Sequence, residues 1–188
     1  MAKKLMVVIV LCIMISTPVY AQEPVLQVLE GQTVIEDMTH PNMTEIDEAE
    51  KYLSENHVYV PIEIEAVCEV YGPKYNIAPE LLEAIIWKES RFTQYAVNAS
   101  GTCKGLMQIH TGSHKKRMER LGVTDIFDVT DNIRVGVDYL AELLQENDLE
   151  TAIMLYNGDK RAYEEGYTSS YVKKILEVSQ ALERSHFK

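Results

Sequence analysis

From about residue 58 onward, the chain is a series of helical apolar patterns separated by short turns that carry glycine or asparagine. Apolar residues recur at spacings of three and four, which places them on one face of an α-helix. Few segments alternate with a period of two, so the pattern predicts a mainly α-helical domain. A first helix is expected to stop before Gly72, and Ser113 is expected to cap a basic one. The expected helices cover residues 62–71, 79–90, 113–121, 132–145, 151–156 and 171–182.

The first 21 residues have the features of a secretory signal peptide. Lys3 and Lys4 precede an unbroken apolar run from Leu5 to Ile15, and small residues lead to a cleavage point after Ala21. The run is shorter than the roughly 20 residues that span a bilayer, although an uncleaved membrane anchor is the alternative. We therefore expect export to the cell envelope, either periplasmic or extracellular.

Residues 22–57 differ in composition from the rest of the chain, with nine acidic residues and a single base, Lys51. Because no apolar period is sustained there, we interpret them as an acidic spacer that is helical at most in part, around residues 45–53. Residues 58–188 are then expected to form the folded domain. The formal net charge of −11 argues against nucleic-acid binding, which requires a basic surface.

Two cysteines, Cys68 and Cys103, would remain after removal of the leader. An exported protein meets conditions that permit a disulfide between them. Two free thiols are the alternative, because a sequence does not show whether the two Cα atoms approach each other. No metal site and no cofactor are expected, since the cysteines and histidines lack ligand spacing.

Within the segment 79–90, Glu89 is in line with the apolar stripe. A helical advance of about 100° per residue places it in the same arc as Leu81 and Ile85, whereas Glu83 is expected on the opposite, solvent-facing side. A carboxyl group that faces apolar surface has a raised pKa, which suits a general acid near neutral pH. The alternative is that the helix frays and Glu89 reaches water.

Four motifs follow one another along the chain: Glu89-Ser90, Gly105 to Ile109, Leu155 to Gly158, and Tyr171 to Leu176. In this order and spacing they closely resemble the catalytic domain of soluble lytic transglycosylases, a goose-lysozyme-like group that cleaves bacterial peptidoglycan. The resemblance covers roughly residues 60 to 180. It implies a lysozyme-like (SLT) helical domain with a substrate groove. The loop before Gly105 departs from the family pattern, because it lacks the usual Gly-Ala pair.

The resemblance also implies a reaction. It is cleavage of the β-1,4 bond between N-acetylmuramic acid and N-acetylglucosamine, in which a 1,6-anhydro sugar forms and Glu89 acts first as acid and then as base. Three residues could instead have a purely structural role. Ser90 could simply end a helix, Met107 could pack in the core, and Tyr171 could donate a hydrogen bond to a buried backbone group. The substrate-binding residues that the resemblance implies are Ser90, Met107, Gln108, Tyr156, Asn157 and Tyr171.

Two other functions are kept as alternatives. A lysozyme-type hydrolase would need a second acid, for which Asp125, Asp128 or Asp131 are available, although Asp128 and Asp131 look like helix caps. A non-catalytic wall-binding protein on the same fold is the other alternative. The expected binding partner is the peptidoglycan glycan strand, bound by a monomer. Residues 22–57 are a candidate adaptor to cell-envelope, secretion or conjugation machinery.

A basic cluster, residues 114–117 with Arg120, stands out in so acidic a chain. It could contact an anionic wall polymer or the peptide carboxylates of the substrate. A solvated helix face is the blander interpretation and the favoured one, since runs of charge mostly keep a surface wet.

Overall fold

The computed structural model describes residues 41–186, and within them it has eight helices and one short antiparallel hairpin. The leader expected over residues 1–21 lies outside the described residues, as do residues 22–40 of the expected spacer. No helix within residues 41–186 is long and apolar enough to cross a membrane. The elements are α1 (Met43–Glu55), α2 (Ile62–Lys74), α3 (Pro79–Ser90), β1 (Cys103–Lys104), β2 (Ile109–His110), α4 (Lys115–Leu121), α5 (Val129–Leu144), α6 (Leu149–Asn157), α7 (Lys160–Glu165) and α8 (Ser170–Ser185).

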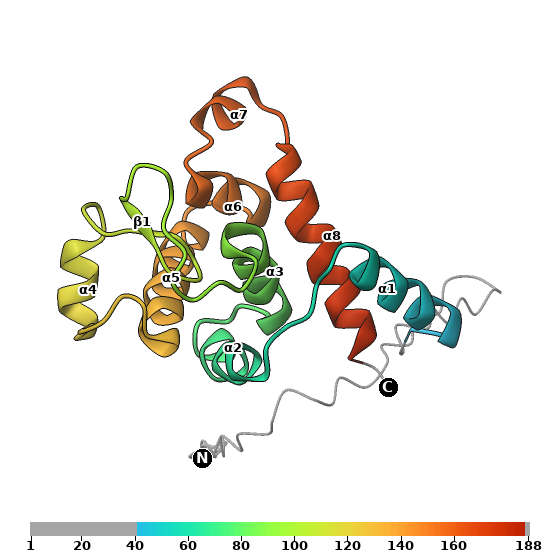
Figure 1. Ribbon diagram of the computed structural model, residues 1–188. Helices are drawn as coiled ribbons and strands as arrows, with labels where there is room; N and C mark the ends of the chain where they lie inside the picture. Colours follow the sequence, from blue (N-terminus) through green and yellow to red (C-terminus); the bar gives the residue numbers. More distant parts are fainter. Residues whose placement is uncertain (1–40, 187–188) are drawn as a thin grey trace, which may run out of the picture. The chain divides into compact units, whose positions relative to one another are not determined.

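The centre of the described unit is α3, which packs against both α2 and α8 (Figure 1). Every residue from Leu81 to Trp87 is buried, and an all-round buried surface is typical of a core helix. The other helices pack in pairs around it: α5 against α2 and α6, and α1 against α8. The predicted mainly helical domain is confirmed.

Side chains of the residues just before the helices determine where several of them begin. Asp128 accepts a hydrogen bond from the Asp131 N–H at 2.9 Å and starts α5 three residues earlier than the pattern predicted. Asp148 and Ser169 cap α6 and α8 in the same way. Such caps satisfy backbone N–H groups that have no partner inside the helix. The interpretation of Asp128 as a capping residue is confirmed.

The segment 41–57 is part of the folded unit, which differs from the expectation of a spacer up to residue 57. Asn42 and Glu45 form a reciprocal capping box at the start of α1. Ile46, Ala49 and Leu53 are buried, and their spacing of three and four places them on one face of the helix. This face packs against α8. The acidic residues within α1 occupy its remaining faces.

Other boundaries also differ from the expected ones. Helix α2 continues through Pro73 to Lys74, because a proline in the last turn removes only one backbone hydrogen bond. Helix α4 begins at Lys115 rather than at Ser113, whose hydroxyl contacts His110 Nδ1 at 2.9 Å instead. The β1–β2 hairpin and the six-residue helix α7 were not expected, since both are too short to show a period.

The predicted position of Glu83 is wrong. The side chain is fully buried, because α2 covers the face of α3 that the helical pattern assigned to solvent. Neither carboxyl oxygen has a hydrogen-bond partner. Burial, together with the nearby Glu80, Glu65 and Glu69, raises the pKa of Glu83 to about 8. A carboxyl group in this position is retained in its neutral form.

Candidate active site

Glu89 lies in the last turn of α3, where that helix is in contact with α8. The helix ends at Ser90, and Arg91 turns the chain with a left-handed φ of 54°. Glu89 is partly buried, and the hydroxyl of Tyr171 in the first turn of α8 donates a hydrogen bond to its Oε1 atom. The packing of α3 on α8 thus brings together two residues from the first and last of the four motifs.

The surroundings of Glu89 shift its pKa upward. Burial raises this pKa, while the Tyr171 hydrogen bond and the positive charge of Lys88 lower it by less. Burial and the charge of Glu89 raise the pKa of Tyr171 in turn, so its phenol stays protonated and can donate. A carboxyl group with a raised pKa holds its proton closer to neutral pH, which is what a general acid requires.

Tyr156, at the end of α6, lies near this carboxyl group. Its hydroxyl donates to the backbone carbonyl of Met107 at 3.0 Å. Burial, and after it the charge of Glu89, raise the pKa of Tyr156 well above its usual value. Two protonated phenols, from Tyr156 and Tyr171, therefore accompany Glu89.

The loop that carries Gly105 to Gln108 is held by Asn132 of α5, a fully buried residue. Its amide oxygen accepts from the Met107 N–H at 2.8 Å, and its nitrogen donates to the carbonyls of Lys104 at 3.0 Å and Ile126 at 2.7 Å. Gly105 has a φ of +77°, and a Cβ there would lie 2.0 Å from the Asn132 nitrogen. Only glycine allows this approach.

Gln108 braces the same loop. It has a left-handed φ of 48°, and its amide nitrogen donates to the carbonyls of Ala96 at 3.3 Å and Gly105 at 2.9 Å. No hydrogen bond to its amide oxygen is formed within residues 41–186. That oxygen is therefore available as an acceptor for a ligand.

Two of the predicted binding residues, Ser90 and Met107, pack within the protein. Ser90 is buried and its hydroxyl donates to the Ile86 carbonyl at 3.1 Å, as expected of a residue at a helix end. The Met107 side chain is fully buried against Gly136 of α5, where an added Cβ would lie 2.3 Å from its sulfur. These positions favour the core alternative for Met107 and a packing role for Ser90. Asn157 is exposed at the end of α6.

The three aspartates considered as a second acid all serve local structure. Asp125 accepts from the Phe127 N–H at 2.9 Å, and Asp128 caps α5. Asp131 accepts from the Thr124 N–H at 3.2 Å and pairs with Arg134 at 3.0 Å. Their engagement in turns and caps leaves the hydrolase alternative without a positioned base among them.

Both cysteines are free thiols in the structure, so the disulfide considered above is not formed. Cys68 is buried in α2, and burial followed by the charge of Glu83 raises its pKa. Cys103 is partly exposed in β1. Across residues 41–186, no group of three or more histidine, cysteine, aspartate or glutamate side chains is arranged to hold a metal ion.

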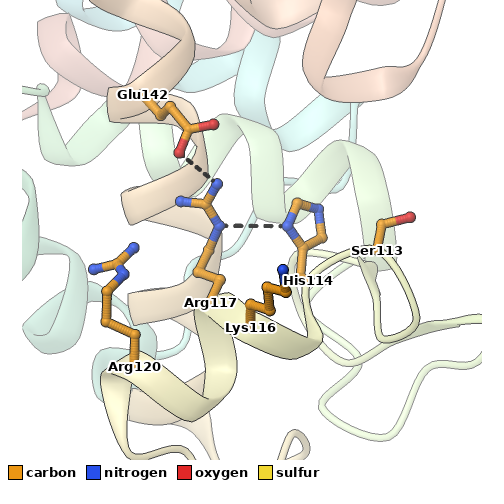
Figure 2. A pocket seen from close by; sticks show the side chains of 6 residues that line it. All are labelled: Ser113, His114, Lys116, Arg117, Arg120 and Glu142. Carbon is orange, nitrogen blue, oxygen red and sulfur yellow. Dashed lines mark hydrogen bonds and ion pairs between the residues drawn. The ribbon is translucent and has the colours of Figure 1, made fainter.

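The basic cluster lines an open pocket of about 320 Å³ (Figure 2). Its arginines are largely neutralised from within the protein, because Arg117 and Arg120 both pair with Asp138 of α5. Burial raises the pKa of Asp138, but the two arginines outweigh it and hold that pKa below its usual value. The residues that line the pocket are Ser113, His114, Lys116, Arg117, Arg120 and Glu142.

Sequence analysis did not single out two residues that support this site, Asn132 and Tyr139. A signal existed for Asn132, since it is a polar residue at helical spacing from Gly136 and Leu140 in an apolar stripe. For Tyr139, which stacks on Tyr156 at a centroid distance of 5.3 Å, no signal existed, because aromatic residues on a helical face mostly belong to a core.

Taken together, the fold and the site define a helical domain in which a partly buried carboxyl group, that of Glu89, is accompanied by two tyrosines and a braced glycine-containing loop. The sequence profile of the family described as "Transglycosylase SLT domain" matches residues 66–177. The chain belongs to this family, and the predicted resemblance is confirmed.

Individual relatives share shorter stretches with the chain. It is 42% identical over 64 residues to "Membrane-bound lytic murein transglycosylase F" of Desulfosudis oleivorans, a match that covers 34% of this chain and 13% of that protein. It is 37% identical over 90 residues to "X polypeptide" of Escherichia coli, covering 42% and 53%. It is 37% identical over 78 residues to "Protein IpgF" of Shigella sonnei, covering 40% and 50%. The matches thus span about half of these last two relatives and a small part of the first.

Proposed function

We propose that this protein is a peptidoglycan lytic transglycosylase in which Glu89 is the catalytic acid and base. The observation that carries the proposal is the environment of Glu89: a carboxyl group with a raised pKa, partly buried, that receives a hydrogen bond from Tyr171. Membership of the SLT family and the name of the relative from Desulfosudis oleivorans support the same reaction class.

In the proposed reaction, protonated Glu89 donates its proton to the oxygen of the β-1,4 bond between N-acetylmuramic acid and N-acetylglucosamine. The bond from that oxygen to the muramoyl anomeric carbon breaks, and an oxocarbenium-like centre develops. The Glu89 carboxylate then removes the proton of the muramoyl 6-hydroxyl, whose oxygen bonds to the anomeric carbon. A 1,6-anhydro sugar results, and Glu89 is again protonated.

Because the substrate supplies its own nucleophile, this route needs neither a second carboxylate nor a held water molecule. That agrees with the local roles of Asp125, Asp128 and Asp131. Tyr171 would stabilise the Glu89 carboxylate between the two proton transfers, since its hydroxyl donates to the charged form. The Gln108 amide oxygen and exposed Asn157 are the proposed contacts to sugar amides and hydroxyls.

Digestion of purified peptidoglycan tests this proposal. The full chain and a Glu89→Gln variant are incubated with cell-wall material, and the masses of the soluble fragments are determined by mass spectrometry. We expect fragments lighter by one water than hydrolysis products, and none from Glu89→Gln. A Glu48→Gln variant, changed at an exposed position of α1, is the matched control. Fragments with free reducing ends would identify a hydrolase instead, and wall that is bound but never cut would identify a binding protein.

A further inference from the structure

Helix α4 is held to α5 by an ion-pair cluster around Asp138. Arg117 and Asp138 are mostly buried, each with 10% of its side chain exposed. Arg120 Nη2 lies 2.5 Å from the Asp138 carboxylate. Figure 2 shows the second pair of Arg117, whose Nη2 lies 2.8 Å from Glu142. Partly buried pairs that share one carboxylate are screened less than isolated surface pairs, and they fix geometry. The orientation of α4 on α5 is therefore well defined.

This orientation brings Arg117 of α4, and His114 immediately before α4, against Tyr139 of α5. The His114 ring centroid lies 4.5 Å from that of Tyr139, and the Arg117 guanidinium lies 5.2 Å from the Tyr139 centroid. Arg117 Nε also donates to His114 Nδ1 at 3.4 Å, so this imidazole nitrogen acts as an acceptor. A stacked cation and a stacked ring both hold an aromatic side chain in place.

Tyr139 in turn contacts Tyr156. The two ring centroids are 5.3 Å apart, with the rings tilted by 34°, and the Tyr139 hydroxyl donates to the Leu155 carbonyl at 3.5 Å. Tyr156 is anchored at its far end by the Met107 carbonyl and lies near Glu89. A continuous set of contacts thus runs from the surface helix α4 to Tyr156, near the carboxyl group of the site.

We propose that Tyr139 is a positioning residue for Tyr156 and is itself seated by His114 and Arg117. The hydroxyl of Tyr156 is fixed by one hydrogen bond, which leaves its ring free to tilt unless a neighbour supports it. Tyr139 supplies that support. With the support removed, Tyr156 tilts and admits water to Glu89, whose raised pKa depends chiefly on its burial. The inference rests on the proposed function only for the catalytic importance of Glu89.

The test follows Glu89 directly by NMR, without substrate. The protein is labelled with ¹³C at glutamate side-chain carboxyls, and the Glu89 signal is assigned as the one lost in Glu89→Gln. We expect Tyr139→Leu to shift the Glu89 titration midpoint downward, toward that of an ordinary glutamate, and Tyr139→Phe to preserve it. Tyr59→Leu removes an exposed tyrosine between α1 and α2 and should leave the midpoint unchanged.

A double substitution shows whether the effect passes through Tyr156. In a Tyr156→Leu background, adding Tyr139→Leu should move the Glu89 midpoint no further, because coupled residues are not additive. Equal shifts in both backgrounds, or no shift in the single variant, would overturn the proposal. Should Tyr139→Leu fail to fold, His114→Ala and His114→Phe replace it: the alanine variant should lower the midpoint and the phenylalanine variant should restore it. Identical midpoints in these two would also overturn it.

Turnover provides an independent measurement. If the wild type cleaves peptidoglycan, Tyr139→Leu should lower kcat about 10-fold with little change in KM, as expected for a small misplacement of reacting groups. If the wild type shows no turnover, the proposed function fails, yet the NMR titrations still decide whether Tyr139 positions Tyr156. The two failures are therefore distinguishable.

Discussion

Two glutamates of the same helix, Glu83 and Glu89, have raised pKa values for the same leading reason, burial. Glu83 is fully enclosed with no hydrogen-bond partner, between α2 and α3. Glu89 is partly exposed and has Tyr171 as its partner. A perturbed carboxyl group is therefore not sufficient for catalysis, because a general acid also needs a path to its substrate and a group that stabilises its charged form.

The largest expected effect is a difference in peptidoglycan cleavage between variants of Glu89 and Glu83. Glu89→Gln should reduce peptidoglycan cleavage by about 10³-fold, in the range expected for loss of a general acid. Glu83→Gln keeps the shape of a side chain that reaches no ligand, so its rate should stay within about twofold of wild type. Initial rates of muropeptide release measure both. Comparable losses in the two variants would break the distinction between a functional and a structural acid.

The pH dependence of the free energy of unfolding should reveal the raised pKa of Glu83. Its pKa of about 8 in the folded protein lies above the ordinary glutamate pKa of 4.5. Between these two values the folded state holds a proton that the unfolded state has lost. The contribution of Glu83 to the free energy of unfolding is fully present below the pKa that Glu83 has in the unfolded state. It is lost as the pH rises to the pKa that Glu83 has in the folded state. The free energy of unfolding should fall by at most about 1.4 kcal/mol per pH unit in this window.

Urea unfolding between pH 4 and 9 measures that slope, and Glu83→Gln is the matched control because it cannot ionise. The variant should show a flatter profile than wild type over the same window. Parallel profiles would mean that the Glu83 carboxyl group is solvated or paired in solution. Glu83 would then resemble Glu89, which is partly exposed and has a hydrogen-bond partner.

Replacement of Glu83 by an apolar side chain should stabilise the protein. Glu83→Met retains length and removes two buried oxygens that lack partners, whose cost is about 1–3 kcal/mol. We expect a gain of about 2 kcal/mol at pH 7 from urea unfolding, with unchanged cleavage. Glu89→Met should give a smaller gain, since Glu89 is partly exposed and hydrogen-bonded. A loss of stability in Glu83→Met would indicate a partner for this carboxyl group.

The smallest expected effect concerns Tyr171, the hydrogen-bond partner that Glu89 has and Glu83 lacks. Tyr171→Phe removes the hydrogen bond that lowers the pKa of Glu89, so this pKa should rise further. The limb of the pH–rate profile that reports deprotonation of Glu89 should move to higher pH, and kcat should fall about 10-fold. An unshifted profile would show that the hydroxyl does not act on Glu89 during turnover.

Local signals along the chain predicted much of the fold. Apolar spacing indicated most of the helices, and Asp128 was interpreted as a cap, because both signals depend on neighbours within a few positions. Glu89 was recognised as a carboxyl in an apolar stripe. Local spacing failed at Glu83, where the pattern assumed that α3 has a solvent face, and at α1, where acidic composition concealed a buried stripe of Ile46, Ala49 and Leu53.

The sequence by itself determined the helical class, the family and the motif that carries Glu89, since these depend on composition and on order along the chain. Only the tertiary structure decided which polar groups are enclosed and which meet. The contacts between Tyr171 and Glu89, between Asn132 and the Met107 loop, and between Tyr139 and Tyr156 join residues from different elements. Such contacts arise from helix packing, and the free energy of a buried carboxyl group depends on what the packing places around it.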